Sequence, residues 1–129
     1  LTEITLGIMP GTMGTQNLIS AVGERRAKEI ILTGRPFSSE EALEWGIANR
    51  VCEPDALLDE TLDTAKRIAG NAPLSVMRAK RALSVARYLD SHTGYLFELE
   101  AYNRLVGTED RHEGVLAFNE KRPPNFKGK

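Results

Sequence analysis

The 129-residue chain is 41% hydrophobic and carries 17 basic and 18 acidic residues, a formal net charge of −1. This balance argues against partners that need a strong positive field, such as nucleic acid or an anionic membrane surface. No apolar run approaches the ~20 residues of a membrane span, and a single cysteine, Cys52, excludes an internal disulfide. We expect one soluble, cytoplasmic polypeptide with enough apolar residues for a core.

The chain opens on an alternation of apolar and polar residues from Leu1 to Leu6. Such alternation is typical of a strand with one buried face. A strand without a neighbour has an unpaired edge, and the chain begins with Leu1 rather than methionine. We therefore expect a fragment of a longer protein. A loop with three glycines and a proline follows, from Gly7 to Thr15.

Most of the remaining chain has the apolar spacing of helices. Gly34 is expected to end one of them, Ser38 with Glu41 forms a capping box at the start of another, and Pro73 suits a first helical turn. The expected helices cover about residues 16–22, 24–33, 38–46, 55–69, 73–87, 95–106 and 108–122. Asp55 and Thr108 are the expected N-caps of two of them.

Motifs for a metal site or a nucleophile are weak. His92 and His112 lack ligand spacing to each other or to Cys52, so we expect no metal. Cys52 follows an apolar residue and is better explained as a small buried hydrophobe than as a nucleophile. The glycine loop also lacks the Lys-Ser/Thr ending of a phosphate-binding P-loop.

Glu3 and the glycine loop close behind it suggest chemistry when they are taken together. Taken alone, Glu3 would be interpreted as a solvent-facing strand residue, and the loop would be interpreted as a plain strand-to-helix turn. However, Gly11 and Gly14 allow the backbone to approach a ligand closely, and the next helix begins with unpaired N–H groups. A carboxylate beside such donors could hold and orient a water molecule.

The segment from Glu3 to Gln16 resembles the signature of the enoyl-CoA hydratase/isomerase (crotonase) family, roughly P-E-x-x-x-G-x-x-P-G-x-G-G-T-Q. The resemblance continues in register through residues 31–35, 42–51 and 117–127. It implies a mostly α fragment of an α/β crotonase (ββα-superhelix) fold, with one short N-terminal strand, a glycine loop and about six to seven helices. Residues 1–50 would be the end of the crotonase core, with the catalytic strand and glycine loop, and 51–129 a helical C-terminal oligomerisation region.

The resemblance also implies roles for single residues. Glu3 would be the catalytic carboxylate, one of two that hold the water added to an acyl-CoA thioester. Gly11, Thr12 and Met13 would form the substrate- and water-binding loop, with the Gly11 N–H donating to the water. Met13 stands where the family usually has glycine, which adds bulk beside the acyl pocket and puts the usual substrate size in doubt.

At the other end, Phe118 and Lys121 match positions that contact coenzyme A bound to a neighbouring subunit. The alternative is a core-facing Phe118 and a solvated Lys121. Coenzyme A is part of the substrate, so no separate cofactor is expected. Members of the family form homo-oligomers, trimers or dimers of trimers, and the exposed apolar faces of the helices favour self-association here.

The second glutamate and both oxyanion donors of the family lie upstream of the position that matches Leu1. We therefore expect the chain to be inactive alone. The favoured activity of the intact enzyme is hydration of trans-2-enoyl-CoA in fatty-acid β-oxidation or related acyl-CoA catabolism. A Δ3-Δ2-enoyl-CoA isomerase and a non-catalytic helical oligomerisation module remain alternatives, and a glutamate at the second position would favour the hydratase.

Overall fold

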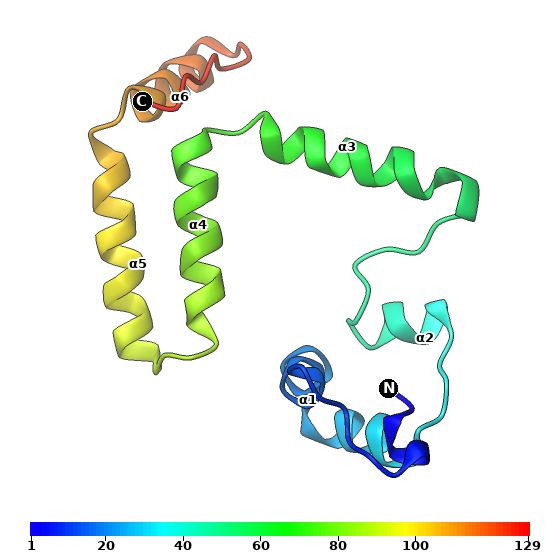
Figure 1. Ribbon diagram of the computed structural model, residues 1–129. Coiled ribbons are helices and arrows are strands. Elements are labelled where there is room, and N and C mark those ends of the chain that lie inside the picture. The colour runs from blue at the N-terminus through cyan, green and yellow to red at the C-terminus, as the bar shows by residue number, and fades with distance from the viewer. The chain divides into compact units, whose positions relative to one another are not determined.

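A computed structural model describes all residues from 1 to 129 and contains six α-helices, two 3-10 helices and no strand (Figure 1). The expectation of a mostly helical chain is confirmed. The chain divides into two compact units, Leu1–Asp55 and Ala56–Lys129. None of the helices is both long and apolar enough to cross a membrane. The elements are η1 Glu3–Leu6, α1 Gly14–Thr33, α2 Ser39–Glu44, η2 Pro54–Ala56, α3 Leu57–Ala69, α4 Pro73–Ala86, α5 Ser91–Val106 and α6 Glu109–Glu120.

The predicted N-terminal strand is wrong, because Glu3–Leu6 form a single 3-10 turn, η1. The Thr5 N–H and Thr5 Oγ1 both donate to the Thr2 carbonyl, at 3.0 and 2.8 Å. Gly7 ends the turn in the left-handed conformation, φ 76°, and its N–H points back at the carbonyls of the turn. A side chain that bonds to the backbone three residues earlier favours a turn over an extended strand.

The first unit is built on α1, which is bent at Gly23 (φ 75°, ψ 164°). The predicted break between two helical stretches is confirmed at this residue. Because no other residue type adopts that conformation readily, the glycine lets both halves of α1 fold toward one core. That core consists of Leu18, Ala27, Ile30 and Ile31, with Val22, Phe37, Trp45 and Ile47 packed around it.

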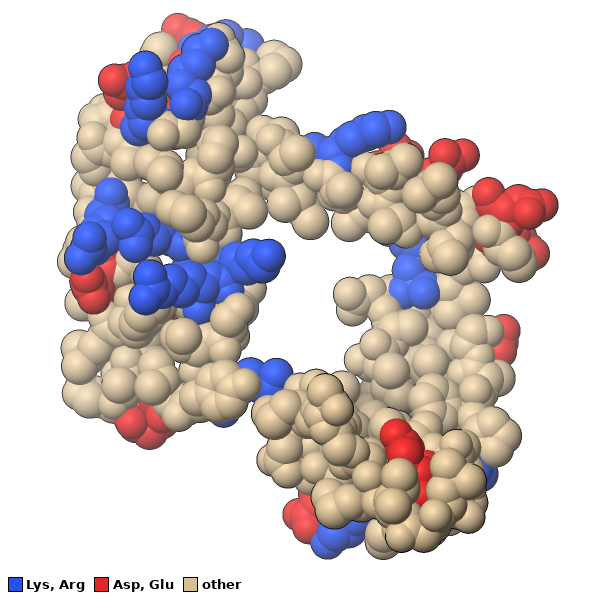
Figure 2. Space-filling view, viewed as in Figure 1, with Lys and Arg blue, Asp and Glu red and all other residues tan.

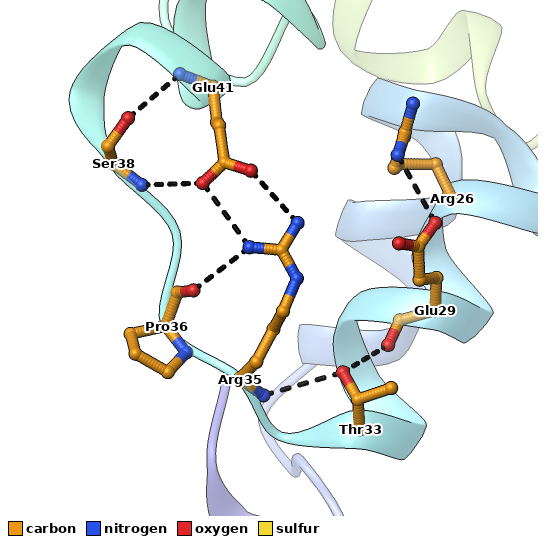
Figure 3. Close-up of polar contacts among 7 residues, drawn as sticks. All are labelled: Arg26, Glu29, Thr33, Arg35, Pro36, Ser38 and Glu41. Carbon is orange, nitrogen blue, oxygen red and sulfur yellow. Dashed lines mark hydrogen bonds and ion pairs between the residues drawn. The ribbon is translucent and has the colours of Figure 1, made fainter.

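The segment between α1 and α2 is held by one ion pair and the predicted capping box (Figure 3). The Arg35 guanidinium donates two hydrogen bonds to the Glu41 carboxylate, at 3.3 and 2.9 Å. The Ser38 hydroxyl accepts from the Glu41 N–H at 3.2 Å, and the Glu41 carboxylate accepts from the Ser38 N–H at 3.0 Å. Chiefly through Arg35, this geometry lowers the pKa of Glu41. The guanidiniums of Arg35 and Arg26 lie 5.3 and 4.6 Å from the centre of the Trp45 ring.

In the second unit, α4 and α5 pack side by side as an antiparallel pair (Figure 1). No side chain of α3, α4 or α5 is fully buried in this chain. Their apolar stripes are therefore open to further packing. Figure 2 shows Lys and Arg side chains gathered over α4 and α5, where Arg78, Arg81 and Arg104 line a hollow of about 200 Å³.

Two expected helix boundaries are wrong. Asp55 does not cap a helix, because Pro54–Ala56 form the 3-10 turn η2 and α3 begins after Ala56. Gly94 does not separate two helices but lies inside α5. The cap of α5 is Asp90, whose carboxylate accepts from the N–H groups of His92 and Thr93. Pro73 at the start of α4 and Thr108 as the cap of α6 are confirmed.

Residues after α6 fold back along that helix and are fixed by two of its carboxylates. Asp110 is only 3% exposed and accepts from the N–H groups of Lys127 and Gly128, at 2.6 and 2.8 Å. Glu113 accepts two hydrogen bonds from Arg122, at 2.6 and 3.0 Å, and one from the Asn125 N–H at 2.7 Å. These bonds hold the C-terminal tail, residues 122–129, in one arrangement.

Candidate active site

Glu3 lies at the start of η1 and is half-buried. Its Oε2 atom is shielded from solvent, yet no donor in the chain reaches it. Buried carboxylate oxygens nearly always accept a hydrogen bond, since leaving one unsatisfied costs about 1–3 kcal/mol or more. This oxygen is therefore an unfilled acceptor, which a donor from outside the chain would reach once the atoms that shield it move aside.

The loop after η1 is buried at its start and open at its centre. Pro10 is fully buried, whereas a Cβ placed on Gly11 would meet no atom within 4 Å. Thr12 and Met13 both adopt left-handed conformations, φ 51° and 69°, and the Gly14 N–H closes the loop on the Gly11 carbonyl at 2.8 Å. At Gly11 the loop thus presents its backbone where no side chain of this chain lies close.

Left-handed backbone at Met13 gives a physical reason for the glycine that the family pattern has there. Residues with a Cβ pay roughly 1–2 kcal/mol in this region. Met13 is the N-cap residue of α1, and its side chain makes no capping bond to the helix. Its side chain is 46% exposed, so the strain is not relieved by burial in this chain.

One backbone hydrogen bond links Glu3 to the start of the loop, and the loop itself packs against the side chain of Leu1. The Ile8 N–H donates to the Glu3 carbonyl at 3.3 Å, and a Cβ on Gly14 would lie 3.0 Å from Pro10 Cβ and 3.5 Å from Leu1 Cδ2. No hydrogen bond joins Oε2 of Glu3 to Gly11, Thr12 or Met13.

Phe118 and Lys121 both lie at the C-terminal end of α6, in the second unit. Phe118 is 83% exposed, so the alternative of a core-facing phenylalanine is wrong for this chain. Lys121 is the C-cap residue, with φ 53°, and its N–H donates to the Phe118 carbonyl at 3.2 Å. An aromatic ring and an ammonium group are therefore displayed at one helix end.

The chain brings together no group of three or more His, Cys, Asp or Glu side chains that could hold a metal. His112 is engaged by its own helix, since Nδ1 lies 2.8 Å from the Thr108 carbonyl oxygen. Cys52 is a free, half-buried cysteine.

The family model for enoyl-CoA hydratase/isomerase matches residues 1–129, the whole chain. The chain belongs to this family. The resemblance found in the Glu3–Gln16 segment is thus confirmed over the full sequence, and the solved structures that the chain matches have the crotonase fold.

Relatives of this family member include the 2,3-dehydroadipyl-CoA hydratase of Escherichia coli (strain K12), 40% identical over 129 residues, which are 100% of this chain and 51% of that protein. A short-chain-enoyl-CoA hydratase of Clostridioides difficile is 42% identical over 116 residues, 90% of this chain and 75% of that protein. A crystal structure of an enoyl-CoA hydratase from Bacillus anthracis has a TM-score of 0.96 and 45% identity, and covers 100% of this chain and 50% of that one.

This crotonase-family chain spans about half the length of most of the curated relatives that it matches.

The carboxylates that hold the C-terminal tail, Asp110 and Glu113, were not singled out by sequence reasoning. The acidic residues in the first turn of this helix suggested only a favourable interaction with the helix N-terminus. No pattern in the sequence shows that the last residues of the chain return to them.

Proposed function

We propose that this chain supplies one catalytic glutamate, Glu3, of an enoyl-CoA hydratase that adds water across the 2,3 double bond of a trans-2-enoyl-CoA thioester. The observation that carries the proposal is the buried Glu3 Oε2 atom without a hydrogen-bond partner. Family membership over the whole chain and relatives named as hydratases support the same activity.

In this proposal Glu3 exchanges a proton with the reacting molecules. Hydration forms a C–O bond from water to C3 and a C–H bond at C2. One carboxylate therefore removes a proton from the attacking water while a proton is delivered to C2, and Glu3 takes part as proton donor or acceptor. The Gly11 N–H donates to the water, a role that needs no side chain.

The thioester oxygen that gains negative charge needs two backbone N–H donors, and the water needs a second glutamate. By resemblance, the two N–H donors and the second glutamate all lie in the part of the relatives that this chain does not match. Loss of one oxyanion donor alone costs roughly 10²–10³ in kcat. We therefore expect the 129-residue chain by itself to show no measurable hydration, and activity to need a segment equivalent to the relatives' other half.

The helical second unit has two proposed roles. Phe118 and Lys121, exposed at the end of α6, would contact coenzyme A bound to a neighbouring subunit, with the ring stacking on adenine and the ammonium group near a phosphate. The unburied apolar stripes of α3 to α5 would pack in a homo-oligomer, a trimer or a dimer of trimers.

The test uses a chimera in which the unmatched half of the Escherichia coli relative is fused ahead of Leu1. Hydration of crotonyl-CoA is followed by loss of the enoyl thioester absorbance, for the chimera, its Glu3→Gln variant and the 129-residue chain. We expect activity only in the unsubstituted chimera. Full activity of Glu3→Gln would rule out Glu3 as the catalytic carboxylate.

The same chimera distinguishes the alternatives. A 3-enoyl-CoA substrate converted to the 2-enoyl isomer without net hydration would identify an isomerase, in which Glu3 alone shuttles the proton. A folded, oligomeric chimera that acts on neither substrate would favour the non-catalytic oligomerisation module.

A further inference from the structure

The support of η1 comes mostly from outside it. Only four residues form the turn, and its terminal hydrogen bonds, from Gly7 to Ile4 and from Ile8 to Glu3, are both 3.3 Å long. A single 3-10 turn of this kind is not stable by itself in water. The direction in which the Glu3 carboxylate points must therefore be set by whatever η1 packs against.

Part of that support is Gly34, the residue that ends α1. An added Cβ at Gly34 would lie 2.8 Å from Thr5 Cγ2 and 3.1 Å from Ile4 Cγ2. Both atoms belong to the two residues that follow Glu3. The turn η1 thus lies against a surface that only a glycine leaves open.

Gly34 is itself fixed. It is buried, and its N–H donates to the carbonyls of Ile30 and Ile31, at 3.1 and 3.2 Å. Ile30 and Ile31 belong to the core of the first unit. Directly after Gly34, Arg35 is held by Glu41, as Figure 3 shows. Besides the contacts of η1 with α1, Gly34 therefore couples the position of η1 to the core.

Thr5 cannot easily move away from an added methyl group at position 34. Threonine is stiff at χ1 because it is branched at Cβ, and Thr5 Oγ1 is committed to the Thr2 carbonyl at 2.8 Å. Rotation of the side chain would break that bond. The whole turn would shift instead, and Glu3 would shift with it.

We propose that Gly34 is a positioning residue for catalysis: by admitting Thr5 and Ile4 against the end of α1, it sets the orientation of the Glu3 carboxylate. This inference rests on the proposed role of Glu3. The sequence pattern assigned Gly34 only the role of ending a helix, and nothing in the spacing of Thr5 and Gly34 reveals their contact.

The test compares Gly34→Ala with Gly46→Ala in the chimera. Gly46 also has a positive φ, 76°, but an added Cβ would meet only the Ala21 carbonyl oxygen, at 3.8 Å. Both variants therefore carry a similar backbone strain, and only the first displaces η1. We expect Gly34→Ala to lower kcat roughly 10- to 100-fold, the size of effect that a misplacement of about 1 Å produces, with little change in KM. Gly46→Ala should keep its kcat.

A rescue variant separates position from stability. Thr5→Ser removes the methyl group that a Cβ at position 34 would strike and keeps the hydroxyl for the Thr2 carbonyl. The double variant Gly34→Ala/Thr5→Ser should therefore regain most of the lost kcat. Absence of rescue, an unchanged kcat in Gly34→Ala, or equal kcat losses in the two glycine variants would each overturn the proposal.

If Gly34→Ala does not fold, the single variant Thr5→Ser tests the proposal instead. It should lower kcat a few-fold because the turn loses its contact, and an unchanged kcat would contradict the inference.

A second test does not depend on catalysis: the rate of hydrogen exchange at the Gly7 and Ile8 amides, measured in the 129-residue chain, reports how firmly η1 is held. We expect faster exchange in Gly34→Ala than in Gly46→Ala. Equal exchange would show that Gly34 does not hold η1. An inactive chimera combined with unequal exchange would instead contradict the proposed function and leave the support of η1 by Gly34 standing.

Discussion

Two terminal segments of this chain fold back on a helix, and the carboxylates beside them differ. At the C-terminal end, both oxygens of buried Asp110 accept backbone N–H groups of the tail, at 2.6 and 2.8 Å. At the N-terminal end, the buried Oε2 atom of Glu3 accepts nothing. The first carboxylate is satisfied by the chain that it holds, whereas the second retains its capacity for a donor from outside.

The difference separates a structural carboxylate from a functional one by hydrogen bonding rather than by burial. A buried charge that is fully paired contributes to the folded arrangement. A buried oxygen without a partner lowers stability and is retained where it serves another purpose, a pattern found at strained functional sites. This criterion supports our proposal that the catalytic carboxylate is Glu3, in η1, and it gives Asp110 a structural role in fixing the tail.

The largest expected effect on stability is at Asp110. Asp110→Asn keeps the shape but replaces one accepting oxygen with an NH2 group that faces a backbone donor. We expect the free energy of unfolding of the second unit to fall by about 1.5–3 kcal/mol, measured by urea denaturation. The exposed Asp59→Asn is the control, with a change within about 0.5 kcal/mol. Equal values for the two variants would contradict the structural role of Asp110.

Gly11→Ala tests whether the open face of the loop is used by a ligand. An added Cβ meets no atom of this chain within 4 Å, so the fold should tolerate it. In the chimera we expect kcat/KM to fall about tenfold, equivalent to about 1.4 kcal/mol. Gly107→Ala is matched, because an added Cβ there also meets nothing within 4 Å. A Gly11→Ala chimera with full activity would remove the loop backbone from the proposed site.

Met13→Gly tests whether the left-handed backbone at Met13 strains the first unit. Glycine relieves the left-handed φ of 69°, and the gain is partly offset by the greater freedom of glycine in the unfolded chain. We expect a net stabilisation of about 0.5–1 kcal/mol in thermal or urea unfolding. Met9→Gly, at a residue without positive φ, should be neutral or destabilising. If both changes destabilise, Met13 is not strained.

The smallest expected effect is the pH dependence of the tail. The hydrogen bonds from Arg122 and from the Asn125 N–H lower the pKa of Glu113 to about 2, from 4.5. A lowered pKa in the folded state adds stability that is complete above about pH 4.5 and disappears as the pH falls toward 2. Exchange of the Asn125 amide should therefore accelerate across this interval in the wild-type chain, relative to Glu113→Gln. Identical pH profiles would show that Glu113 does not anchor the tail.

Local rules predicted the helices well where a capping or breaking residue marks the boundary. The capping box at Ser38, the break at Gly23, Pro73 at the start of α4 and Thr108 as a cap are all found in the structure. Each of these signals acts over at most four residues, so neighbouring sequence is sufficient to detect it.

The errors arose where local patterns are ambiguous. Six residues from Leu1 to Leu6 satisfy both a strand alternation and a 3-10 turn, and the decision came from the Thr5 side chain and Gly7. Gly94 has the character of a helix breaker, although Asp90 starts α5 one turn earlier.

For the candidate site, the family pattern pointed to Glu3 and the loop, but contacts between distant residues lay beyond sequence reasoning. Gly34 and Thr5 are 29 positions apart in the sequence. The tail residues that bind Asp110 lie more than 15 positions after it. Neither contact has a periodicity, a cap or a turn signal in the sequence.

The most direct measurement compares activity with stability in Glu3→Gln. Because the wild-type Oε2 has no donor, the amide should leave the unfolding free energy of the chain unchanged or slightly raised, while crotonyl-CoA hydration by the chimera falls at least about 100-fold. A Glu3→Gln chain that unfolds more easily while the chimera keeps its rate would show instead that Glu3 has the structural role that Asp110 has at the other end.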